Sequence, residues 1–518
     1  MVTVEQLYKH FGVLADAKDK AGEHEEEYSS IISAVKGGSG EKRLASQFIA
    51  RFFKFFPKQA HDAINALFDL CEDDNINIRK QAIKDLTTLC KVNNDYVPKI
   101  SEALTQLLQC DDSAELSLVQ SSLSSLFSIG AKGTLQGIYA QIMGEEDVVR
   151  EKALKFLTVK LATLPDETLD KEAEDFVIAE CKKVLQDVTK DEFIDLVTIM
   201  KCLKSMNTVQ GRQQLVDLIT EQAELDQPFD ASDTDSVDRL IQCIKQCSSL
   251  FSKNVHSRAF VAYICDNVIP ALPDLVTSEE GADIRLDILK VLAEISEFAG
   301  ELEQEDTKVE KVFIRLLEYM PLPPSEENDD LTNGTEEPKL QFSFVECLMF
   351  TFHQLGRKCP GFLTDENNAE RLKDFRIRLQ YFARGVQVYI KQLRAALQGK
   401  TGEELKTDEN KIKVVALKIT SNINTLIKDL FHNPPSYKST LTLSWQPLLV
   451  SKRITPITFD AGDPSAKKLN REARQIYAPP GGKFSEKAGT YQQQGGGRGS
   501  FRGGRGRGRG GGFRGKYW

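Results

Sequence analysis

The chain has 518 residues and a formal net charge of −9, and this modest total conceals a division between two regions. Residues 451–518 carry 15 basic and 4 acidic residues, whereas residues 1–450 carry 52 basic and 72 acidic residues. This asymmetry indicates an acidic body with a basic, nucleic-acid-seeking tail, and the absence of any 18-residue apolar run excludes a membrane-spanning helix.

The first 35 residues predict two amphipathic helices, which would cap the end of a repeat array. The opening segment from Met1 to Tyr8 carries charge where a signal peptide needs an unbroken apolar stretch. The ten cysteines form no C-x-x-C pair, and Cys243 and Cys247, one helical turn apart, have no histidine at ligand spacing. We therefore expect a soluble intracellular protein with free thiols and with no metal ion or cofactor.

A helical repeat organises the residues that follow, up to about position 206. The apolar residues of the run 78–90 lie on one stripe of a helix, and Asn75 or Asn77 can cap its start. The pattern apolar-Arg-x-x-Ala-apolar within this run returns 71 residues later. Four related registers lie at Arg43, Arg79, Ser117 and Arg150. Their spacing of about 36 residues predicts an α-solenoid of antiparallel helix pairs of the HEAT kind over residues 1–206, in which the third register has lost its arginine.

Helical periodicity continues after residue 206 although the repeat signature fades, which predicts a second all-helical module over residues 207–450. Residues 321–338 are proline-bounded, acidic and almost without apolar side chains, so we expect a disordered loop there. The expected fold class is therefore all-α throughout. The segment Leu104-x-x-Leu107-Leu108 resembles a docking motif, but leucines in a repeat helix are more simply explained as core residues.

A heptad pattern marks residues 371–398. The residues spaced by seven are Leu372, Leu379, Val386 and Leu393. One interpretation is a zipper-like or basic docking helix, because the face outside this seam is rich in arginine and lysine. The other is an ordinary core helix, which the bulky aromatic residues Phe375, Phe382 and Tyr389 favour for the seam but not for the basic face.

Two acidic clusters are predicted at successive turns of the repeat. They comprise Glu145, Glu146 and Asp147, and then Asp187, Asp191 and Glu192. Together these residues would form one patch that attracts a basic partner. The alternative, in which they are solvated loop charges and helix caps, stays open at this point.

The tail after residue 450 is predicted to be disordered, with two functional segments. A bipartite nuclear localisation signal is formed by Lys452, Arg453, Lys467, Lys468 and Arg471, although its 13-residue spacer is slightly long. The last 24 residues alternate glycine with aromatic residues and with Arg498, Arg502, Arg505, Arg507, Arg509 and Arg514. Such segments bind RNA with little sequence preference. The basic tail could also fold back on the acidic body and compete with its ligands.

No catalytic constellation is recognisable in the sequence. None of the six histidines lies in an H-E-x-x-H motif or beside G-x-S-x-G, and the glycine-rich region is followed by no helix that would complete a phosphate loop. We therefore expect a binding protein and not an enzyme.

The whole chain resembles the apoptosis inhibitor 5 family. The matching segments include residues 3–8, residues 41–45, residues 376–385 and residues 434–440. The resemblance implies a HEAT-like N-terminal half, an armadillo-like C-terminal half and an anti-apoptotic nuclear scaffold with some cytoplasmic pool. It also implies acetylation of Lys253.

The same resemblance implies partners. They are RNA, the mRNA export machinery, an Acinus-like apoptotic factor reached through the heptad helix, and a basic ligand such as fibroblast growth factor 2. We expect the protein to be a monomer with no membrane association. An alternative function is an RNA-processing or mRNA export adaptor whose role in survival is indirect.

Overall fold

The computed structural model describes residues 2–275, 283–323, 340–365, 368–400, 404 and 407–446. Every regular element in these ranges is helical, and the only other pairing is an isolated antiparallel bridge between Ser252 and Val255. This confirms the predicted all-α class. Met1–Gln446 forms one compact unit, so the predicted boundary at 206/207 lies inside it and stays a prediction. None of the described helices has the length and apolar character that crossing a membrane requires.

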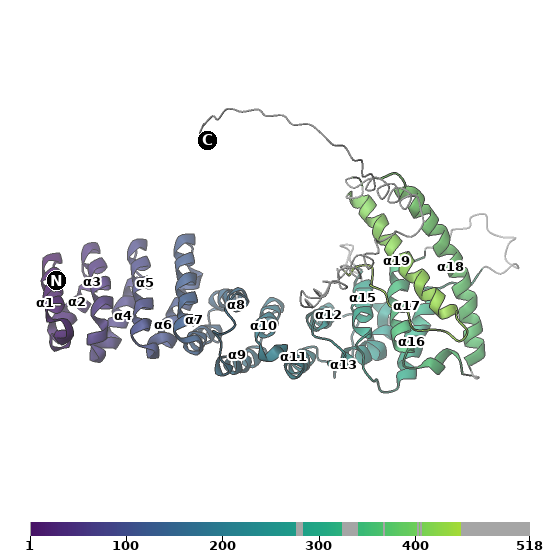
Figure 1. The fold of residues 1–518 in the computed structure, drawn as a ribbon, viewed down its shortest axis with the longest axis horizontal. Helices are drawn as coiled ribbons and strands as arrows, with labels where there is room; N and C mark the ends of the chain where they lie inside the picture. Colours follow the sequence, from purple (N-terminus) through teal and green to yellow (C-terminus); the bar gives the residue numbers. More distant parts are fainter. Residues whose placement is uncertain are drawn as a thin grey trace, which may run out of the picture. The chain divides into compact units, whose positions relative to one another are not determined.

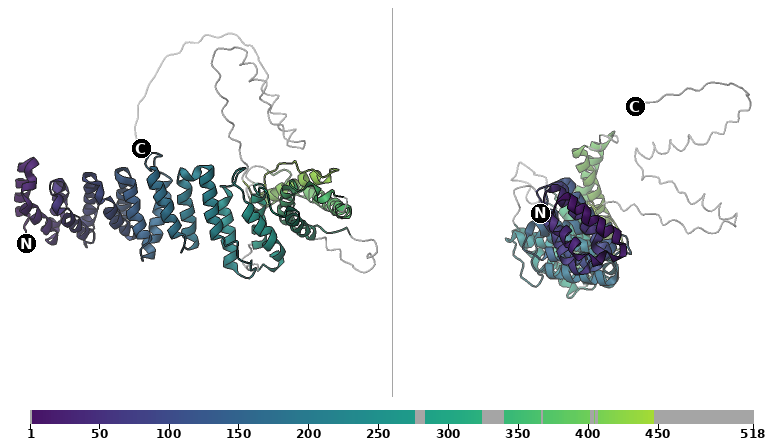
Figure 2. Two further views of the ribbon diagram at one scale, coloured as in Figure 1. Left: turned by 90° about the horizontal axis from the view of Figure 1, so that it is seen from below. Right: turned by 90° about the vertical axis from the view of Figure 1, so that its left-hand side faces the viewer.

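The helices follow one another as antiparallel pairs, and in Figure 2 those of the first repeats stand side by side in layers. The first ten (Figure 1) are α1 (Val4–Ala17), α2 (Glu25–Ser33), α3 (Ser39–Phe52), α4 (Ala60–Cys71), α5 (Ile76–Val92), α6 (Val97–Gln106), α7 (Ser113–Ile142), α8 (Asp147–Leu161), α9 (Lys171–Val184) and α10 (Lys190–Cys202). The others are α11 (Val209–Gln222), α12 (Thr234–Ser248), α13 (Arg258–Tyr263), α14 (Ile269–Ala271), α15 (Ile284–Ser296), α16 (Glu305–Glu318), α17 (Phe342–Gly356), α18 (Ala369–Leu397) and α19 (Asp408–Phe431).

One helix of each pair belongs to a continuous row. In this row α3, α5, α7, α8, α10, α12, α15, α17 and α19 contact one another in that order. Helix α7 contributes twice, because it consists of two helices that meet at Gly130, where φ is −163° and ψ is 90°. The first half belongs to the row, and the second half packs against α6 and against α9, where the Tyr139 hydroxyl lies 3.2 Å from Cys181 Sγ. Gly137 in the second half lies so close to α6 that a Cβ atom would meet the Pro98 carbonyl oxygen at 2.3 Å.

Helix α5 forms where the sequence pattern predicts it, with the predicted cap and the predicted buried stripe. The Asn75 side chain accepts a hydrogen bond from the Asn77 amide at 2.9 Å and so caps the first turn. The apolar stripe is buried against α3, α4 and α7. Leu104 and Leu108 are also buried, so these two leucines of the L-x-x-L-L segment belong to the core.

Ion pairs connect successive helices of the row. Arg79 in α5 donates from Nε and Nη2 to the two carboxylate oxygens of Glu115 in α7, at 2.8 and 2.7 Å. Arg150 in α8 donates from Nε to Glu192 in α10 at 2.7 Å. Both arginines occupy the predicted repeat register, so at these two steps the residue that reveals the repeat in the sequence also links neighbouring pairs. Arg43 of the same register makes no such pair among the described residues, and Lys42 with Asp73 and Ser46 with Asp85 provide the contacts there. We call this series of contacts the inter-pair ladder.

Residues 432–446 form a strap that buried polar groups hold against α17 and α19. The Glu346 carboxylate, which is inaccessible to solvent, accepts from the Ser444 amide at 3.0 Å and from the Ser444 hydroxyl at 2.7 Å. Asp429 accepts from the Ser439 amide at 2.7 Å and contacts His353 Nε2 at 3.0 Å. Trp445 donates its indole N–H to Glu294 of α15 at 2.5 Å. The environment of this tryptophan therefore reports on the packing of the last pairs.

Replacing Arg79 by alanine removes the partner of a carboxylate that is only 2% exposed. We expect the free energy of unfolding to fall by about 2–3 kcal/mol, because a buried charge is left unpaired. Alanine in place of Lys132, whose pair with Glu172 is solvent-exposed, should cost less than about 1 kcal/mol. Amide hydrogen exchange in α5 and α7 measures both effects. Equal protection of these helices in the Arg79→Ala variant and the parent would contradict the structural role of the ladder.

Candidate functional site

The two predicted acidic turns lie next to each other in the structure. Glu146 precedes the first turn of α8, which contains Asp147, and Asp191 lies in the first turn of α10. Arg150 Nη2 donates to the backbone carbonyl of Asp187 at 2.6 Å, which ties the turn before α10 directly to α8. The acidic side chains therefore come from one edge of the solenoid, where neighbouring helices of the row begin.

Glu192 differs from the other five residues of the predicted patch. Its carboxylate pairs with Arg150 and completes a capping box with Thr189, and its side chain is 12% exposed. Burial raises the pKa of Glu192, but the hydrogen bonds from Thr189 and Arg150 outweigh it, so the pKa is lowered overall. Glu192 is therefore ionised and neutralised within the fold, and it adds no free charge to the patch.

The remaining carboxylates are exposed and make no side-chain hydrogen bond or ion pair with any described residue. They are Glu145, Glu146, Asp147, Asp187 and Asp191, which we call the acidic edge. Glu146 occupies the N-cap position of α8 without a side-chain capping bond, and the cap of α10 is Thr189. The capping interpretation thus applies to Glu192 alone among the six.

A groove of about 680 Å³ continues the acidic edge between α10 and α12. Asp187 lines it together with the exposed residues Glu221 and Asp235. The basic residues of the same groove are already paired, Lys190 with Asp238 at 2.6 Å and Arg239 with Glu224 at 2.7 Å. An excess of negative charge therefore extends from the acidic edge into this groove.

The heptad seam of α18 is part of the core. Leu379 and Val386 are inaccessible, Leu393 is 6% exposed and Leu372 is half-buried. Phe375 of the same helix packs edge-on against aromatic rings of α16 and α17. The core-helix interpretation of the seam therefore holds for Leu379, Val386 and Leu393, which a docking partner would reach only after the domain had opened. The assignment of these three residues as a docking surface is corrected.

The basic face of α18 is divided between structural and free cations. Arg371 pairs with Glu310 at 2.8 Å, and Arg378 pairs with Asp374 at 2.9 Å while also donating to a carbonyl of the α16–α17 connection. The exposed cations with no partner among the described residues are Lys373, Arg384, Lys391 and Arg394. Only this part of the basic face is available to a ligand.

Lys253 lies at the tip of the turn between the bridged residues Ser252 and Val255, and its side chain is exposed. Its carbonyl accepts a hydrogen bond from His256 Nε2 at 2.8 Å, which fixes the backbone of the turn. The ammonium group has no partner among the described residues, so acetylation at this position stays a prediction with an accessible target.

Several predicted segments lie outside the described residues. These are most of the acidic loop 321–338, the localisation signal Lys452, Arg453, Lys467, Lys468 and Arg471, and the arginines Arg498, Arg502, Arg505, Arg507, Arg509 and Arg514. In the described ranges no group of three or more His, Cys, Asp or Glu side chains is arranged to hold a metal ion.

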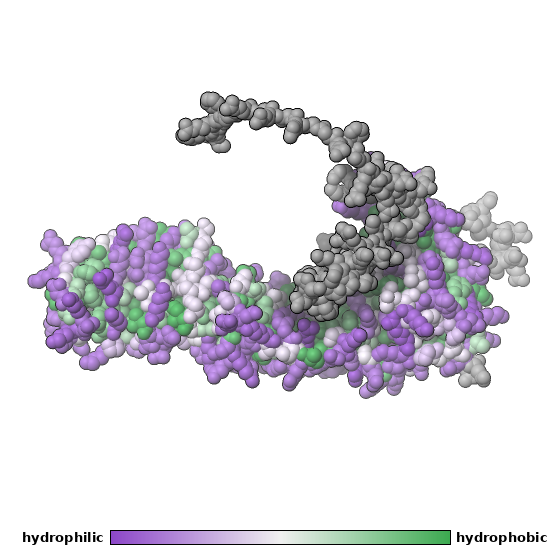
Figure 3. All heavy atoms as spheres, in the orientation of Figure 1, coloured by the Kyte–Doolittle hydropathy of each residue, from purple (hydrophilic) through white to green (hydrophobic). Residues whose placement is uncertain are grey.

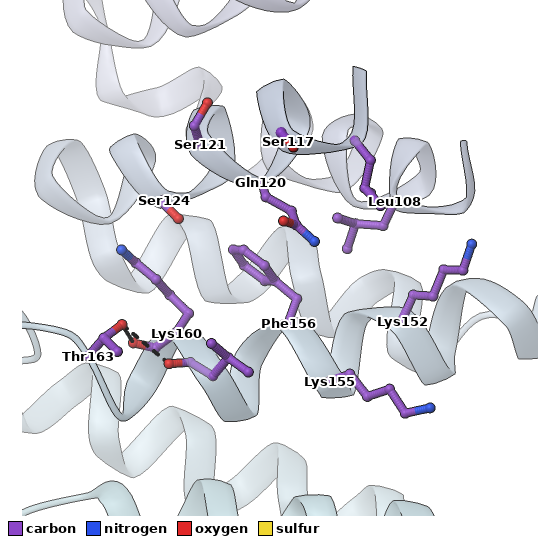
Figure 4. A pocket seen from close by; sticks show the side chains of 12 residues that line it. Leu108, Ser117, Gln120, Ser121, Ser124, Lys152, Lys155, Phe156, Lys160 and Thr163 are labelled. Atoms are coloured by element: carbon purple, nitrogen blue, oxygen red, sulfur yellow. Dashed lines mark hydrogen bonds between the residues drawn. The ribbon is translucent and has the colours of Figure 1, made fainter. Parts of the chain in front are cut away.

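Sequence reasoning missed a second groove, of about 710 Å³, between the first half of α7 and α8. In Figure 4 the side chains of Lys152 and Lys160 extend from α8 toward α7 on either side of Phe156, and Lys155 points away. Exposed residues Ser117, Gln120 and Ser121 line the α7 side. The sequence feature that could have indicated this groove is Ser117, which occupies the register where the other three repeats have arginine.

The visible face of the molecule is mostly hydrophilic, with apolar residues in narrow stripes along the N-terminal helices (Figure 3). Recognition of a partner on such a surface depends on charge and on grooves more than on a broad apolar interface. The acidic edge, the α10–α12 groove and the α7–α8 groove are therefore the candidate binding surfaces of the described chain.

Comparison with known proteins gives a consistent result. The family model described as apoptosis inhibitory protein 5 matches residues 4–516. Apoptosis inhibitor 5 of Gallus gallus is 58% identical over 497 residues, covering 95% of this chain and 95% of the relative. The human protein of the same name is also 58% identical, covering 95% and 94%. The Drosophila melanogaster homolog is 45% identical and covers 94% of each chain.

The buried seam of α18 leads to a prediction for Leu379. Replacing Leu379 by glutamate places a carboxylate in an inaccessible site, so we expect a loss of at least about 3 kcal/mol of stability in the C-terminal pairs. Trp445 fluorescence in a Trp518→Phe background measures the loss. The control, Arg384→Glu with Lys391→Glu on the exposed face, should stay within about 0.5 kcal/mol of the parent. A Leu379→Glu variant with parental stability would mean that the seam is accessible.

Proposed function

The chain belongs to the apoptosis inhibitory protein 5 family, and we propose that it acts as a non-enzymatic nuclear scaffold whose acidic edge holds a basic protein partner. Relatives named apoptosis inhibitor 5 support the anti-apoptotic role itself. The observation that carries the scaffold proposal is the concentration of five unpaired, exposed carboxylates at the adjacent N-terminal ends of α8 and α10.

The geometry of the acidic edge suits electrostatic recognition. Arg150 is neutralised by its ion pair with Glu192, so this arginine does not offset the negative charge of the acidic edge. A partner with a lysine- or arginine-rich surface would be steered to this edge, and its association rate would fall steeply with salt. Fibroblast growth factor 2, a basic ligand implied by the family resemblance, fits this chemistry.

The state of the thiols supports a binding role over catalysis. Burial raises the pKa of Cys90, Cys243 and Cys265 to about 12 in each case. These cysteines are therefore protonated near neutral pH and are not activated nucleophiles. An Acinus-like partner at α18 would meet the free cations Lys373, Arg384, Lys391 and Arg394, since the heptad seam is buried.

RNA contact through residues 451–518 is the second part of the proposal. Its support is compositional, because six arginines alternate with glycine and aromatic residues near the end of the chain. This segment and the basic cluster at 452–471 fit residence in RNA-rich regions of the nucleus. If RNA contact rather than partner binding proves essential for survival, the protein is better described as an RNA-processing or export adaptor.

Reversing two charges of the acidic edge tests the scaffold proposal. In the Asp187→Lys/Asp191→Lys variant we expect the affinity for fibroblast growth factor 2 to fall at least about tenfold at low salt, because attraction is replaced by repulsion. Calorimetry at two salt concentrations measures the change. The matched control is Asp62→Lys/Asp69→Lys, which alters exposed, unpaired residues of α4. Unchanged affinity in the first variant would remove the acidic edge from the proposal.

Substitution of the six tail arginines tests RNA contact. Glutamine at positions 498, 502, 505, 507, 509 and 514 removes charge and stacking, so we expect the affinity for a single-stranded RNA oligomer to fall at least about tenfold. Lysine at the same positions keeps the charge and should give an intermediate loss. Fluorescence anisotropy measures both, and a cell-survival assay on the same variants shows whether RNA contact and protection are lost together. Parental RNA affinity in the glutamine variant would exclude these arginines as the RNA contact.

A further inference from the structure

Among the four repeat registers the arginine–glutamate contact is made by Arg79 and by Arg150. At the α3–α5 step other contacts replace it, Lys42 with Asp73 and Ser46 with Asp85. At the α7–α8 step nothing described replaces it.

Glu115, which accepts the hydrogen bonds from Arg79, lies two residues before the register residue Ser117. The corresponding position on α8, two residues before Arg150, is Val148, which is 52% exposed. Both members of the ion pair are thus replaced, by Ser117 and Val148. In the described ranges no ion pair or side-chain hydrogen bond joins the first half of α7 to α8.

The α7–α8 groove lies where the ion pair between these helices is missing. Ser117 lines this groove, and its floor is apolar, formed by Leu108, Leu116 and Phe156. Val159, which is 68% exposed, lies on the α8 side. The helices still contact each other at their buried stripes, so the gap is confined to the surface layer that the ladder fills elsewhere.

The cations of the groove lack internal partners. Lys152 and Lys160 make no ion pair within the described residues, whereas Lys155 pairs with Glu151 on its own helix. The carboxylates of α7 nearest the N-terminal end of the groove, Asp112 and Glu115, are already engaged by cations of α5. Two positive charges therefore lie on either side of an apolar floor, on a body whose net charge is negative.

We propose that the α7–α8 groove binds an acidic peptide segment of a partner protein, with Lys152 and Lys160 pairing with its carboxylates and the apolar floor holding a side chain between them. The two lysines are eight residues apart, which corresponds to about 12 Å along the helix axis. An amphipathic helix with acidic residues about two turns apart and apolar residues between them matches this arrangement. Ser117, Gln120 and Ser121 supply hydrogen bonds at the opposite rim.

The chemistry of the groove favours a peptide over a nucleic acid. Phe156 is only 9% exposed, so too little of its ring is accessible for a base to stack on it. The groove has no arginine, and the net charge of residues 1–450 repels a long polyanion. A peptide with few charges is repelled less, and it gains from covering apolar surface that a phosphate backbone cannot use.

The test uses the full-length protein and three fluorescent probes. These are an amphipathic peptide with two pairs of glutamates about two turns apart around a leucine face, the same peptide with glutamine for glutamate, and a single-stranded oligouridylate. We expect the acidic peptide to bind and to protect α7 and α8 from amide hydrogen exchange. In the Lys152→Glu/Lys160→Glu variant its affinity should fall at least about tenfold.

Two further variants separate the groove from general charge effects. The Lys84→Glu/Lys91→Glu variant changes the same number of charges at exposed, unpaired lysines of α5, and it should leave peptide affinity within about twofold of the parent. The charge-neutral Ser117→Arg/Val148→Glu variant rebuilds the missing ladder contact across the groove. It should abolish the protection of α7 and α8 by the peptide without loss of thermal stability.

Three results would overturn the proposal. The first is the absence of peptide-dependent protection in α7 and α8 of the parent. The second is equal affinity for the glutamate and glutamine peptides. The third is protection of these helices by oligouridylate but not by the peptide, which would identify the groove as a nucleic-acid site.

Discussion

The contact that fixes the α5–α7 and α8–α10 steps of the row is the buried ion pair from the arginine of one helix to a glutamate of the next. A helix pair in a solenoid cannot bury its apolar face alone, so the array is stable only where neighbours are held in register. The Arg79–Glu115 pair does this with two parallel hydrogen bonds to a carboxylate that is nearly inaccessible. Bidentate geometry fixes orientation as well as distance, which lysine at the same place would not do.

The same constraint explains where surface charge gathers. Because the row helices α8 and α10 run in parallel, their N-terminal ends lie at one edge, and acidic residues are favoured there by the partial positive charge of each helix end. The ion pairs between row helices then determine which of these carboxylates remain unpaired. Glu192 is neutralised by Arg150, while Asp187 and Asp191 beside it are not. The acidic edge thus consists of the carboxylates that no ion pair or cap of the fold neutralises.

Much of this could be predicted from the sequence, because local patterns determine helices and their caps. The stripe after Asn75, the repeat register of Arg79 and the all-helical character of the chain all follow from spacing. Contacts between distant residues could not be predicted in the same way. The partner of Arg150 lies 42 residues away, and the seam of α18 is buried by aromatic rings of other helices. A heptad pattern is the same whether its seam packs against a second chain or against its own domain, so spacing alone could not distinguish these outcomes.

Helix α8 separates two surfaces of opposite character. On the side that faces α10 lies Arg150, which is paired with Glu192, and the first turn of α8 belongs to the acidic edge. Toward α7 it presents Lys152 and Lys160 across an apolar floor, where the ladder is missing. Ligands of opposite charge would therefore meet the same helix on different sides without competing for a residue. Since neighbours in a solenoid are coupled mainly through their shared interfaces, a ligand that stiffens the α7–α8 step would also stabilise the orientation of the acidic edge. The lost arginine at Ser117 is on this argument not a defect in the repeat, but the feature that leaves the α7–α8 step open as a binding groove.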